Sequence, residues 1–503
     1  MLRKNFLIRS GLLLAIAFFL SGSLALPGCS GKTKTAIVSG RVAVDETGIA
    51  GVVVSDGYET TLTDRSGNYR LPIHPEAEFV FISLPSGYKI PQTDGIAKFY
   101  EPLDISQKKQ KINFNLQKNE LDDTRHAFVI WADPQVKTGS DVSRMMDEPV
   151  PDVAAHLQTL GNIPVHGITC GDIVFDQFHL YPDYKKAVSQ MGIPFFQLVG
   201  NHDIDYKAPS RKMATQQFKE AFGPTYYSFN RGKIHYVALN DVLFKGDDEA
   251  YKDKRRKYIG HISEEQLQWL KKDLQYIPEG STLVISLHIP TYEIKFLKSA
   301  VRTEFETATV GNRDELYKLL EPYRVHIMSG HTHYNETAEQ ANRMEHNHAS
   351  VCSAWWTGNI CTDGTPGGYG VYEVNGDSIR WYYKPTGFDP SYQFRIYPQG
   401  SSPERPDEII ANVWNWDTGW KVNWFEDGTP KGEMERFLGY DPLAYKNMFG
   451  KDVPEEKGSL EPTRTEHLFS AKPSANAKEI KVEVTDRFGN KYIKTLILQE
   501  RAK

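Results

Sequence analysis

The stretch FFQLVGNHDIDY, residues 195–206, decides how the centre of this chain is interpreted. An apolar run that is typical of a buried strand ends at Gly200 and passes directly to Asn201, His202 and Asp203. Gly-Asn and His-Asp pairs are ordinary turn formers, so this stretch alone leaves two interpretations open, a turn and a site that binds a metal or moves a proton. The residues that follow the other apolar runs of the chain decide between these two interpretations.

Four further apolar runs end in the same kind of polar residue. They are 127–132, 167–170, 283–287 and 325–329, and they are followed by Asp133 and Gln135, by Asp172, by His288, and by His331 and His333. Ligands of an α/β sheet bind beyond the carboxyl ends of its strands, so these five ends are expected to converge if the strands run parallel. Turn chemistry explains one such residue but does not predict the same placement at five strand ends.

The donor set indicates a metal centre. Carboxylate, amide and imidazole groups without a thiolate favour Mn, Fe, Zn or Mg over a structural zinc site built from cysteines. Seven donors are too many for one tetrahedral ion, but they suit two ions that share a carboxylate, an arrangement used for displacement at phosphorus.

Helical patterns alternate with these runs and with a sixth apolar run at 234–239. The clearest pattern covers residues 263–277, where Ser263 and Gln266 form a capping box and leucines recur on one face. Alternation of this kind predicts an α/β domain between residues 125 and 385.

The string of Asp133-x-Gln135, Gly171-Asp172, Gly200-Asn201-His202-Asp203, His288 and Gly330-His331-x-His333 resembles the calcineurin-like metallophosphoesterase family. The resemblance covers residues 125–385 and extends to the exported bacterial branch that carries β domains on both sides. It implies an αββα sandwich core flanked by two small all-β domains. The implied activity is hydrolysis of phosphomonoesters or phosphodiesters at a dinuclear metal centre through a metal-bound hydroxide.

The resemblance also implies a role for each site residue. Asp172 would bridge two divalent ions; one ion would also take Asp133, Gln135 and His333, and the other Asn201, His288 and His331. His202 would contact the phosphoryl oxygen or protonate the leaving group, positioned by Asp203, although Asp203 is equally explained as a loop-capping residue. The family's first motif usually ends in His. Gln135 is a weaker and harder donor, which favours Mn or Mg over Zn.

Two further residues are candidates for substrate binding. Asp176 follows Asp172 closely and either lines the site or is a turn acid. In a Gly-rich stretch at 354–370, Trp355 and Trp356 either stack on a sugar, base or lipid headgroup or pack the domain, and Trp356 is the candidate for substrate binding.

The flanking regions contrast with the centre. Residues 36–117 alternate short β-rich runs with turn signals, as in a β-sandwich, and resemble carboxypeptidase-regulatory-like or transthyretin-like modules. Residues 386–503 are again β-rich, with a predicted hairpin around Gly489-Asn490 and four tryptophans between residues 414 and 424. The tryptophans suit either core packing or a carbohydrate-binding surface.

The N-terminus predicts export. Residues 1–29 have the basic start, short apolar core and small residues of a signal peptide. The sequence LPGC, which ends at Cys29, resembles a lipoprotein signal in which that cysteine is acylated, while cleavage after Ala25 is the alternative. We therefore expect a cell-envelope protein held in the periplasm or outer membrane by a lipid anchor.

Composition limits the partners. The 503 residues carry a net charge of −5, which gives no electrostatic basis for nucleic-acid binding. The expected substrates are phosphorylated small molecules, lipid headgroups or glycans. In an exported protein Cys352 and Cys361 could pair, whereas Cys170 lies in an apolar run that predicts a buried thiol. The alternative functions are a catalytically inactive binding or scaffold protein and a carbohydrate-binding surface lipoprotein.

Overall fold

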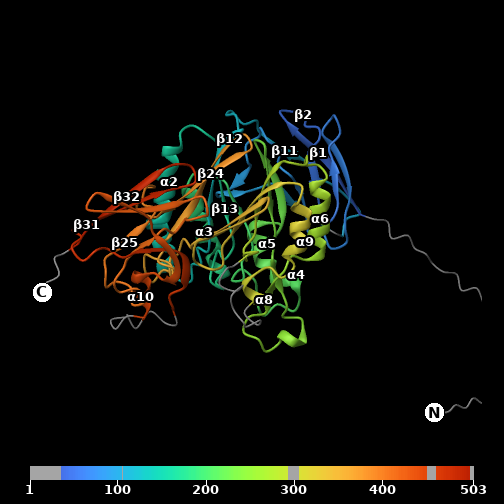
Figure 1. Cartoon of the computed structure of the whole chain (residues 1–503). Coiled ribbons are helices and arrows are strands. Elements are labelled where there is room, and N and C mark those ends of the chain that lie inside the picture. Colours follow the sequence, from blue (N-terminus) through green and yellow to red (C-terminus); the bar gives the residue numbers. More distant parts are fainter. Residues whose placement is uncertain (1–35, 105, 293–304, 450–459, 499–503) are drawn as a thin grey trace, which may run out of the picture. The chain divides into compact units, whose positions relative to one another are not determined.

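The computed structural model describes residues 36–498, except residue 105 and the segments 293–304 and 450–459 (Figure 1). The predicted signal peptide and Cys29 lie outside the described residues. Among the helices that are described, none has both the length and the apolar character needed to cross a bilayer.

Two large sheets form the centre of the molecule. The first has the order β24-β23-β12-β13-β14-β8-β7 and the second the order β15-β16-β19-β20-β22-β21. The strands of the first are β24 (Ser378–Pro385), β23 (Gly368–Asn375), β12 (Arg125–Trp131), β13 (Val165–Thr169), β14 (Phe195–Gln197), β8 (Ile96–Ala97) and β7 (Gln92–Thr93). Those of the second are β15 (Tyr227–Arg231), β16 (Ile234–Ala238), β19 (Thr282–Ser286), β20 (Arg324–Ser329), β22 (Arg343–Asn347) and β21 (Glu336–Gln340).

The strands that carry the predicted site residues run parallel. In the first sheet β12 pairs in parallel with β13, and β13 with β14. In the second, β16, β19 and β20 pair in parallel in that order. These strands are apolar along their length because both of their faces are covered, as is usual for parallel strands.

The two sheets pack face to face through aromatic side chains. Phe196 of the first sheet stacks on Phe229 of the second, with ring centroids 3.8 Å apart, and Phe128 meets Tyr236 edge to face at 5.4 Å. All four rings are buried and belong to the largest apolar cluster, so the interface between the sheets forms the main core.

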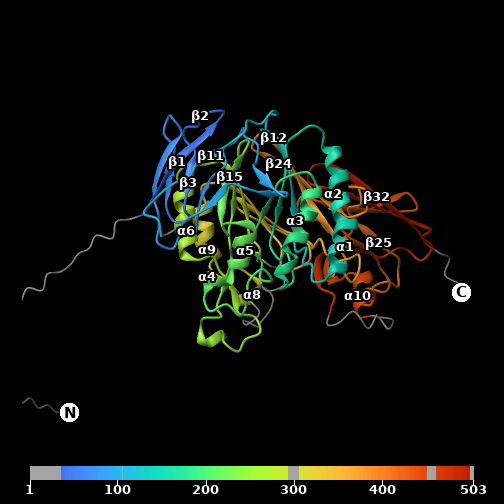
Figure 2. The ribbon, with the colours of Figure 1, turned by 180° about the vertical axis from the view of Figure 1, so that it is seen from behind.

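Helices cover the outer faces of both sheets (Figure 2). On the first sheet lie α1 (Gly139–Asp147), α2 (Pro149–Leu157) and α3 (Tyr181–Gln190); on the second lie α6 (Glu264–Leu274) and α9 (Arg313–Leu320). The hydroxyl of Tyr184 in α3 contacts Thr169 of β13, and Asp273 of α6 contacts His235 of β16. The expected αββα sandwich is confirmed, and α6 begins where the sequence predicts, with Ser263 as the N-cap that accepts from the Gln266 N–H.

Shorter elements complete the central region. They are the helices α4 (Arg211–Ala214), α5 (Gln216–Phe222) and α8 (Phe305–Ala308), the 3₁₀ turns η1 (Gln158–Leu160), η2 (Phe178–Leu180) and η3 (Glu249–Tyr251), and a two-stranded sheet of β17 (Val242–Phe244) and β18 (Tyr258–Gly260).

The N-terminal region is all-β and consists mainly of two sheets. One contains β1 (Ile37–Val44), β2 (Thr47–Gly48), β5 (Asn68–Pro72), β10 (Lys109–Lys111) and β11 (Phe114–Asn115). The other contains β4 (Thr60–Leu62), β3 (Val53–Ser55), β6 (Phe79–Ile82) and β9 (Tyr100–Pro102).

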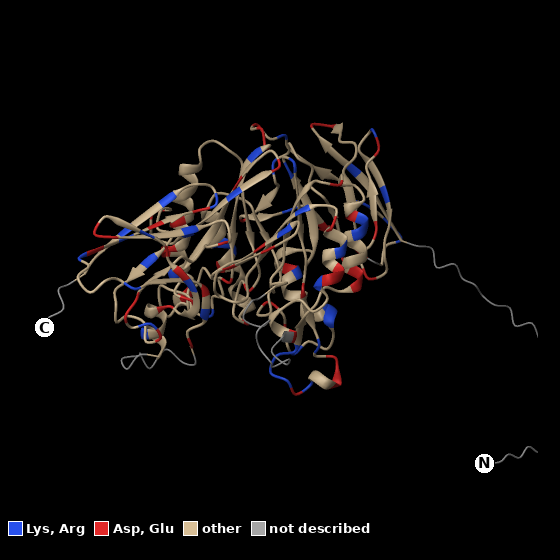
Figure 3. Ribbon diagram, viewed as in Figure 1, with Lys and Arg blue, Asp and Glu red and all other residues tan. Residues whose placement is uncertain are grey.

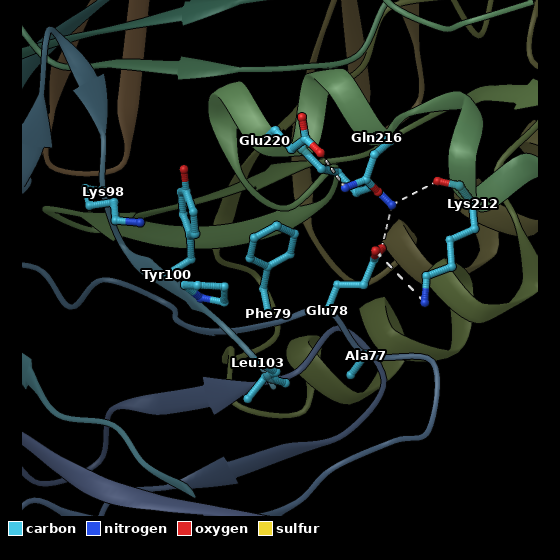
Figure 4. Close-up of a pocket in the computed structure, with 11 residues that line it drawn as sticks. Ala77, Glu78, Phe79, Lys98, Tyr100, Leu103, Lys212, Gln216 and Glu220 are labelled. Atoms are coloured by element: carbon cyan, nitrogen blue, oxygen red, sulfur yellow. Dashed lines mark hydrogen bonds and ion pairs between the residues drawn. The ribbon is translucent and has the colours of Figure 1, made fainter. Parts of the chain in front are cut away.

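This region does not stand apart from the central sandwich. Strands β7 and β8 leave it to extend the first central sheet, where Ile96 pairs with Phe195 of β14. A second junction is a cavity of about 440 Å³. Residues of β6, β9 and helices α4 and α5 line it (Figure 4). At its wall the buried ammonium of Lys219 lies 2.6 Å from a carboxylate oxygen of Glu78.

The C-terminal region contains two four-stranded sheets. One has the order β25 (Arg395–Tyr397), β26 (Ile409–Asn412), β30 (Arg464–Ala471), β29 (Glu435–Tyr440), and the other β28 (Thr429–Glu433), β27 (Lys421–Glu426), β31 (Glu479–Thr485), β32 (Lys491–Ile497). Helix α10 (Pro442–Phe449) follows β29. The hairpin predicted around Gly489-Asn490 is confirmed, because β31 and β32 pair across this turn.

The C-terminal tryptophans serve mainly as core residues. Trp414 and Trp420 are buried, and Trp416 and Trp424 are partly buried against the same apolar cluster as Trp420. This placement favours the packing interpretation over a carbohydrate-binding surface.

Acidic and basic positions are interspersed along the described ribbon in the view of Figure 3, in keeping with the small net charge of −5.

Candidate metal centre

The seven predicted metal ligands come after five parallel strands of the two sheets. Asp133 and Gln135 follow β12, Asp172 follows β13, Asn201 follows β14, His288 follows β19, and His331 and His333 follow β20. The side chains of Asp172, His288 and His331 place one ligand atom each within 4.8 Å of one another. All seven positions are buried except His331, which is partly exposed.

A group of acceptor atoms faces His288 Nε2. The other ring nitrogen, Nδ1, donates to the Cys170 carbonyl at 2.7 Å, so Nε2 of the neutral ring carries a lone pair. Within 3.3 Å of Nε2 lie Asn201 Oδ1, His331 Nδ1 and Asp172 Oδ1. His331 Nε2 in turn donates to the Thr307 carbonyl at 2.9 Å, which leaves Nδ1 of that ring without a proton.

Four acceptors therefore converge with no proton among them. Burial lowers the pKa of both His288 and His331, so the rings are neutral and cannot supply one. Lone pairs that face each other in a buried site repel unless a cation lies between them. This arrangement fits a divalent metal ion, which takes imidazole nitrogens together with carboxylate and amide oxygens.

A second set of donors lies on the other side of Asp172. Asp133 Oδ1 and Gln135 Oε1 are buried and find no hydrogen-bond partner among the described residues. His333 Nε2 lies 3.5 Å from Asp133 Oδ1. Burial lowers the pKa of His333 to about 4, so this ring too is a neutral donor. Unpartnered buried oxygens are costly, and a second cation would satisfy them.

Asp172 lies between the two sets. Its Oδ1 is 3.3 Å from His288 Nε2, and its Oδ2 accepts a hydrogen bond from the side-chain amide of Gln135. The two oxygens of one carboxylate thus face the two donor sets, which is the placement required of a bridging ligand.

The backbone is strained at this site. Non-glycine residues with positive φ are uncommon, because the side chain crowds the backbone. Five of the seven candidate ligands adopt such angles, namely Asp133, Gln135, Asp172, His331 and His333, with φ between 38° and 70°. Strain concentrated in this way is typical of functional sites, where surrounding contacts hold the unfavourable conformation.

One glycine allows the close approach of two ligand loops. A Cβ atom on Gly200 would lie 2.0 Å from the backbone nitrogen of Asp172 and 2.2 Å from its Oδ1. The loop that carries Asn201 therefore contacts Asp172 at a distance that any side chain would prevent.

His202 is oriented by Asp176. Its Nδ1 lies 2.9 Å from Asp176 Oδ1, and its backbone N–H donates to Asp172 Oδ1 at 2.8 Å. Burial disfavours the charged ring, but the carboxylates of Asp172 and Asp176 outweigh it and raise the pKa of His202. An imidazole whose charged form is favoured in this way, held beside the donor cluster, is suited to donate a proton.

Asp203 bonds the backbone of the neighbouring loops rather than the ring of His202. Its carboxylate accepts from the backbone N–H groups of Gly200, Ile173 and Val174 and from the hydroxyl of Tyr181. Burial, together with Asp172, raises its pKa to about 7. Of the two interpretations of Asp203, the geometry favours the loop-capping residue, and Asp176 takes the orienting role.

Trp356 is buried and packs the domain. Its indole N–H donates to the Pro134 carbonyl at 2.9 Å, and the side chain belongs to the main core. The neighbouring Trp355 is partly exposed and stacks on His333, with ring centroids 4.3 Å apart and an interplanar angle of 23°. Adjacent residues of this turn face different surroundings, so the substrate-binding prediction fits Trp355 rather than Trp356.

The expectation that Cys352 and Cys361 could pair is wrong in this structure. Both are buried free thiols, and so is Cys170, as predicted. Burial raises the pKa of the Cys352 thiol to about 12 and also raises the pKa of Cys361, so both are uncharged. Cys352 packs in the main core, and Cys361 packs in a small cluster with Ala349, Tyr383 and Trp414.

Sequence reasoning missed two supporting acids. Asp241 accepts from the backbone N–H groups of His288 and Ile289, and Asp363 accepts from the N–H of Asn335, just beyond His333. The signal for Asp241 was present, because Asn240 and Asp241 follow the apolar run of β16 as the other polar residues follow theirs. Asp363 is held in turn by His467 of the C-terminal region, a contact that no local pattern predicts.

Sequence models of known families match three consecutive stretches of the chain. The calcineurin-like phosphoesterase model matches residues 141–335, and the models for the N-terminal and C-terminal regions of calcineurin-like phosphoesterases match residues 36–119 and 345–492. The chain belongs to the calcineurin-like phosphoesterase family.

Two relatives within this family illustrate its range. Purple acid phosphatase 15 of Arabidopsis thaliana is 30% identical over 164 residues, which cover 30% of this chain and 27% of the relative. A probable glycerophosphodiester phosphodiesterase GpdQ of Arcobacter nitrofigilis is 26% identical over 183 residues, or 35% of this chain and 60% of the relative. The matches thus span less than two thirds of either relative.

Solved structures of related enzymes show low similarity to this calcineurin-like phosphoesterase. A purple acid phosphatase from seeds of yellow lupin (Lupinus luteus) gives a TM-score of 0.37 at 13% identity and covers 67% of each chain. The 5′-nucleotidase of Candida albicans gives a TM-score of 0.30 at 11% identity and covers 51% of this chain and 50% of its own.

Proposed function

We propose that this protein hydrolyses phosphoric esters with two divalent metal ions bound at the donor cluster. The observation that carries the proposal is the convergence of four proton-free acceptors at His288 Nε2, together with the unpartnered oxygens of Asp133 and Gln135 across Asp172. Membership of the calcineurin-like phosphoesterase family supports the reaction class.

The residues divide into two ligand sets that share one carboxylate. Asn201, His288 and His331 would hold one ion, and Asp133, Gln135 and His333 the other, with Asp172 common to both. When bound, two such ions neutralise the phosphoryl oxygens and activate water for in-line displacement. The protein fixes their positions, because strained backbone and buried hydrogen bonds hold each ligand before any ion arrives.

His202 supplies the proton for the leaving group. Asp172 and Asp176 raise the pKa of its ring, which favours the imidazolium form, and Asp176 fixes its orientation. Donation of that proton to the departing oxygen matters most when the leaving alcohol is weakly acidic. Asp203 contributes indirectly by holding the N–H groups of the Asp172 and Asn201 loops.

The proposal is tested by turnover of p-nitrophenyl phosphate and bis-p-nitrophenyl phosphate. Metal-stripped protein is assayed alone and after addition of Mn, Mg, Zn or Fe, with Asn201→Ala as the variant and Asn230→Ala, a residue of β15 outside the donor cluster, as the control. We expect metal-restored turnover that the Asn201 change removes and the control retains. Turnover that survives both chelation and the Asn201 change would overturn the proposal.

We also propose that the protein is exported and held in the cell envelope by a lipid on Cys29. The support is the layout of residues 1–29, with a basic start, an apolar core and the sequence LPGC. Expression in a bacterial host with labelled palmitate tests it. Label should enter the wild-type protein and not Cys29→Ala, and an unlabelled wild-type protein cut after Ala25 would contradict it.

The substrate at that location would be a phosphorylated small molecule, lipid headgroup or glycan. A catalytically inactive scaffold is disfavoured, since all seven candidate positions carry a side chain that can bind a metal ion. Five of these seven also keep the strained backbone angles described above. A protein that acts only by binding carbohydrate is disfavoured, since Trp414 and Trp420 are buried.

A further inference from the structure

The turn at residues 353–356 is a strained segment beside the metal centre. Ser353, Trp355 and Trp356 all have positive φ, at 54°, 50° and 61°. For large side chains this conformation is unfavourable, and it persists only where surrounding contacts enforce it. Three such residues within four positions indicate that the turn is held in this shape.

Helix α1 and the loop after β12 enforce this conformation. Arg144 of α1 donates to the carbonyls of Trp356 and Gly358, and at 2.7 Å to the side-chain oxygen of Asn359. The Trp356 indole is fastened to the Pro134 carbonyl, one residue before Gln135. The turn is thereby tied to the loop that carries two candidate ligands.

This conformation determines where the Trp355 side chain lies. Unlike Trp356, the Trp355 side chain is not part of the main core and remains partly exposed. One face of its indole covers His333, which is itself buried. The exposed part of the indole therefore lies elsewhere on the ring, and the ring itself adjoins a candidate ligand, His333. A large apolar side chain is held there at a conformational cost without adding to the core.

We propose that Trp355 forms an aromatic subsite that stacks on a planar ring of the substrate's leaving group. An ester held at the donor cluster lies next to His333, so a substituent on its phosphorus reaches the adjoining indole. The indole carries no charge and one polar hydrogen, which makes it a poor partner for the phosphoryl group and a good one for a flat ring. This inference rests on the proposed function and names the substrate class, esters of ring-bearing alcohols.

Binding of two phosphonates measures the subsite without turnover. Phenylphosphonate and methylphosphonate share the phosphonate group and differ in the ring. Their affinities for the full-length protein loaded with Mn are measured by calorimetry in wild type, Trp355→Ala and Trp355→Phe. The matched control is Trp424→Ala, a half-buried tryptophan of β27 in the C-terminal region.

The expected result is a preference for phenylphosphonate of about 2- to 12-fold in wild type and in the control, the range of aromatic stacking. Trp355→Ala should abolish the preference and Trp355→Phe should keep most of it. A ratio that is unchanged in Trp355→Ala would overturn the subsite, even if both affinities fall together, because that result indicates only support of His333. A wild type that binds neither phosphonate would overturn it as well.

Hydrolysis of benzyl phosphate and propyl phosphate separates this inference from the proposed function. Both leaving alcohols are weakly acidic, so the ratio of their kcat/KM values reports the ring. A fall of that ratio in Trp355→Ala supports the subsite. Ring-dependent phosphonate binding without any hydrolysis would support the subsite and refute the proposed function.

Discussion

At the scale of single residues, the site depends on which atom of each ring carries a proton. His288 and His331 each donate one ring nitrogen to a backbone carbonyl, of Cys170 and Thr307, so the nitrogens that face each other are bare. This outer contact fixes the tautomer before a metal binds, as backbone carbonyls do in many metal sites. The strands bring the two imidazoles together, and the contacts with the carbonyls leave the facing nitrogens free to bind a metal ion.

The role of His202 predicts a dependence on the leaving group. His202→Gln should lower kcat by about 100-fold or more for an alkyl phosphate, because the departing alkoxide then lacks a proton donor. The loss should be much smaller for p-nitrophenyl phosphate, whose leaving group is stable as an anion. Steady-state kinetics on both esters provide the measurement, and equal losses on the two would exclude a proton-donor role.

Gln135 predicts the metal preference. An amide oxygen is a harder and weaker donor than imidazole, so the wild type should be more active with Mn or Mg than with Zn. Gln135→His should shift the preference toward Zn and raise Zn affinity, measured by competition with a chelator of known affinity. Gln107→His, at an exposed position of the N-terminal region, is the control. An unchanged order of metals in Gln135→His would show that this position is not a ligand.

At the scale of elements, the place of the candidate site could be predicted because ligands of an α/β sheet bind beyond the carboxyl ends of its parallel strands. Apolar runs marked β12, β13, β14, β19 and β20 to within two residues at every end, and their parallel pairing gathers the polar residues beyond them at one edge. The same rule does not say which of two adjacent residues faces the site. Trp355 and Trp356 point in different directions because both have left-handed backbone angles in an irregular turn, and Arg144 holds that turn through the carbonyls of Trp356 and Gly358.

Other features lay beyond local patterns. Strands β7 and β8 have two residues each, too few for any periodicity, yet they join the N-terminal region to the central sheet. The partner of His202 was also invisible, since Asp176 and Asp203 are both acids close to the motif and only the folded loops distinguish them.

The junction between the N-terminal region and helix α5 gives a stability prediction. The Lys219 ammonium is 7% exposed and pairs with Glu78, which is 31% exposed. Lys219→Ala leaves that carboxylate with only its longer, 4.0 Å contact to the exposed Lys212. We expect a loss of about 2 kcal/mol of unfolding free energy, below the cost of breaking a fully buried pair because Glu78 contacts solvent. Lys212, at 44% exposure, lies 3.7 Å from Glu76 and 4.0 Å from Glu78, and it is the exposed lysine of the same cluster that serves as the comparison.

Urea denaturation of the three proteins measures this effect. Lys212→Ala should change the unfolding free energy by less than about 0.5 kcal/mol, as exposed pairs do. Similar losses in the two variants would show that burial of Lys219 adds nothing to the junction.

At the scale of the whole molecule, buried histidines couple folding to pH. Burial lowers the pKa of His126, His326 and His348 from 6.5 to about 4. A base whose pKa is lower in the folded state contributes stability above pH 6.5, and that contribution is lost as the pH falls toward 4, because the unfolded chain takes up protons first.

His126 offers a variant to test this coupling, since its ring bonds the Asp123 carbonyl and the Tyr236 hydroxyl. Between pH 7 and pH 5 the stability advantage of wild type over His126→Gln should shrink by about 2 kcal/mol. The exposed His179→Gln serves as the control, with no such change. Urea midpoints at the two pH values measure it, and an advantage that is independent of pH would contradict the prediction.

The three regions act as one structure around the metal centre. The N-terminal region extends the sheet that carries Asp133, Asp172 and Asn201, while His467 of the C-terminal region holds Asp363 against the loop after His333. Both flanking regions thus support the loops that carry the ligands.

The number of metal ions that the protein binds tests the shared-carboxylate centre most directly. Stripped protein is reloaded with Mn, passed through a desalting column and analysed for metal per chain by mass spectrometry, beside Asp172→Ala and the control Asp183→Ala, an acid on the exposed face of α3. The structure predicts two ions per chain in wild type and in the control, and a loss of both in Asp172→Ala. A wild type that retains no metal, or an Asp172→Ala variant that retains both ions, would contradict a centre built on a shared carboxylate.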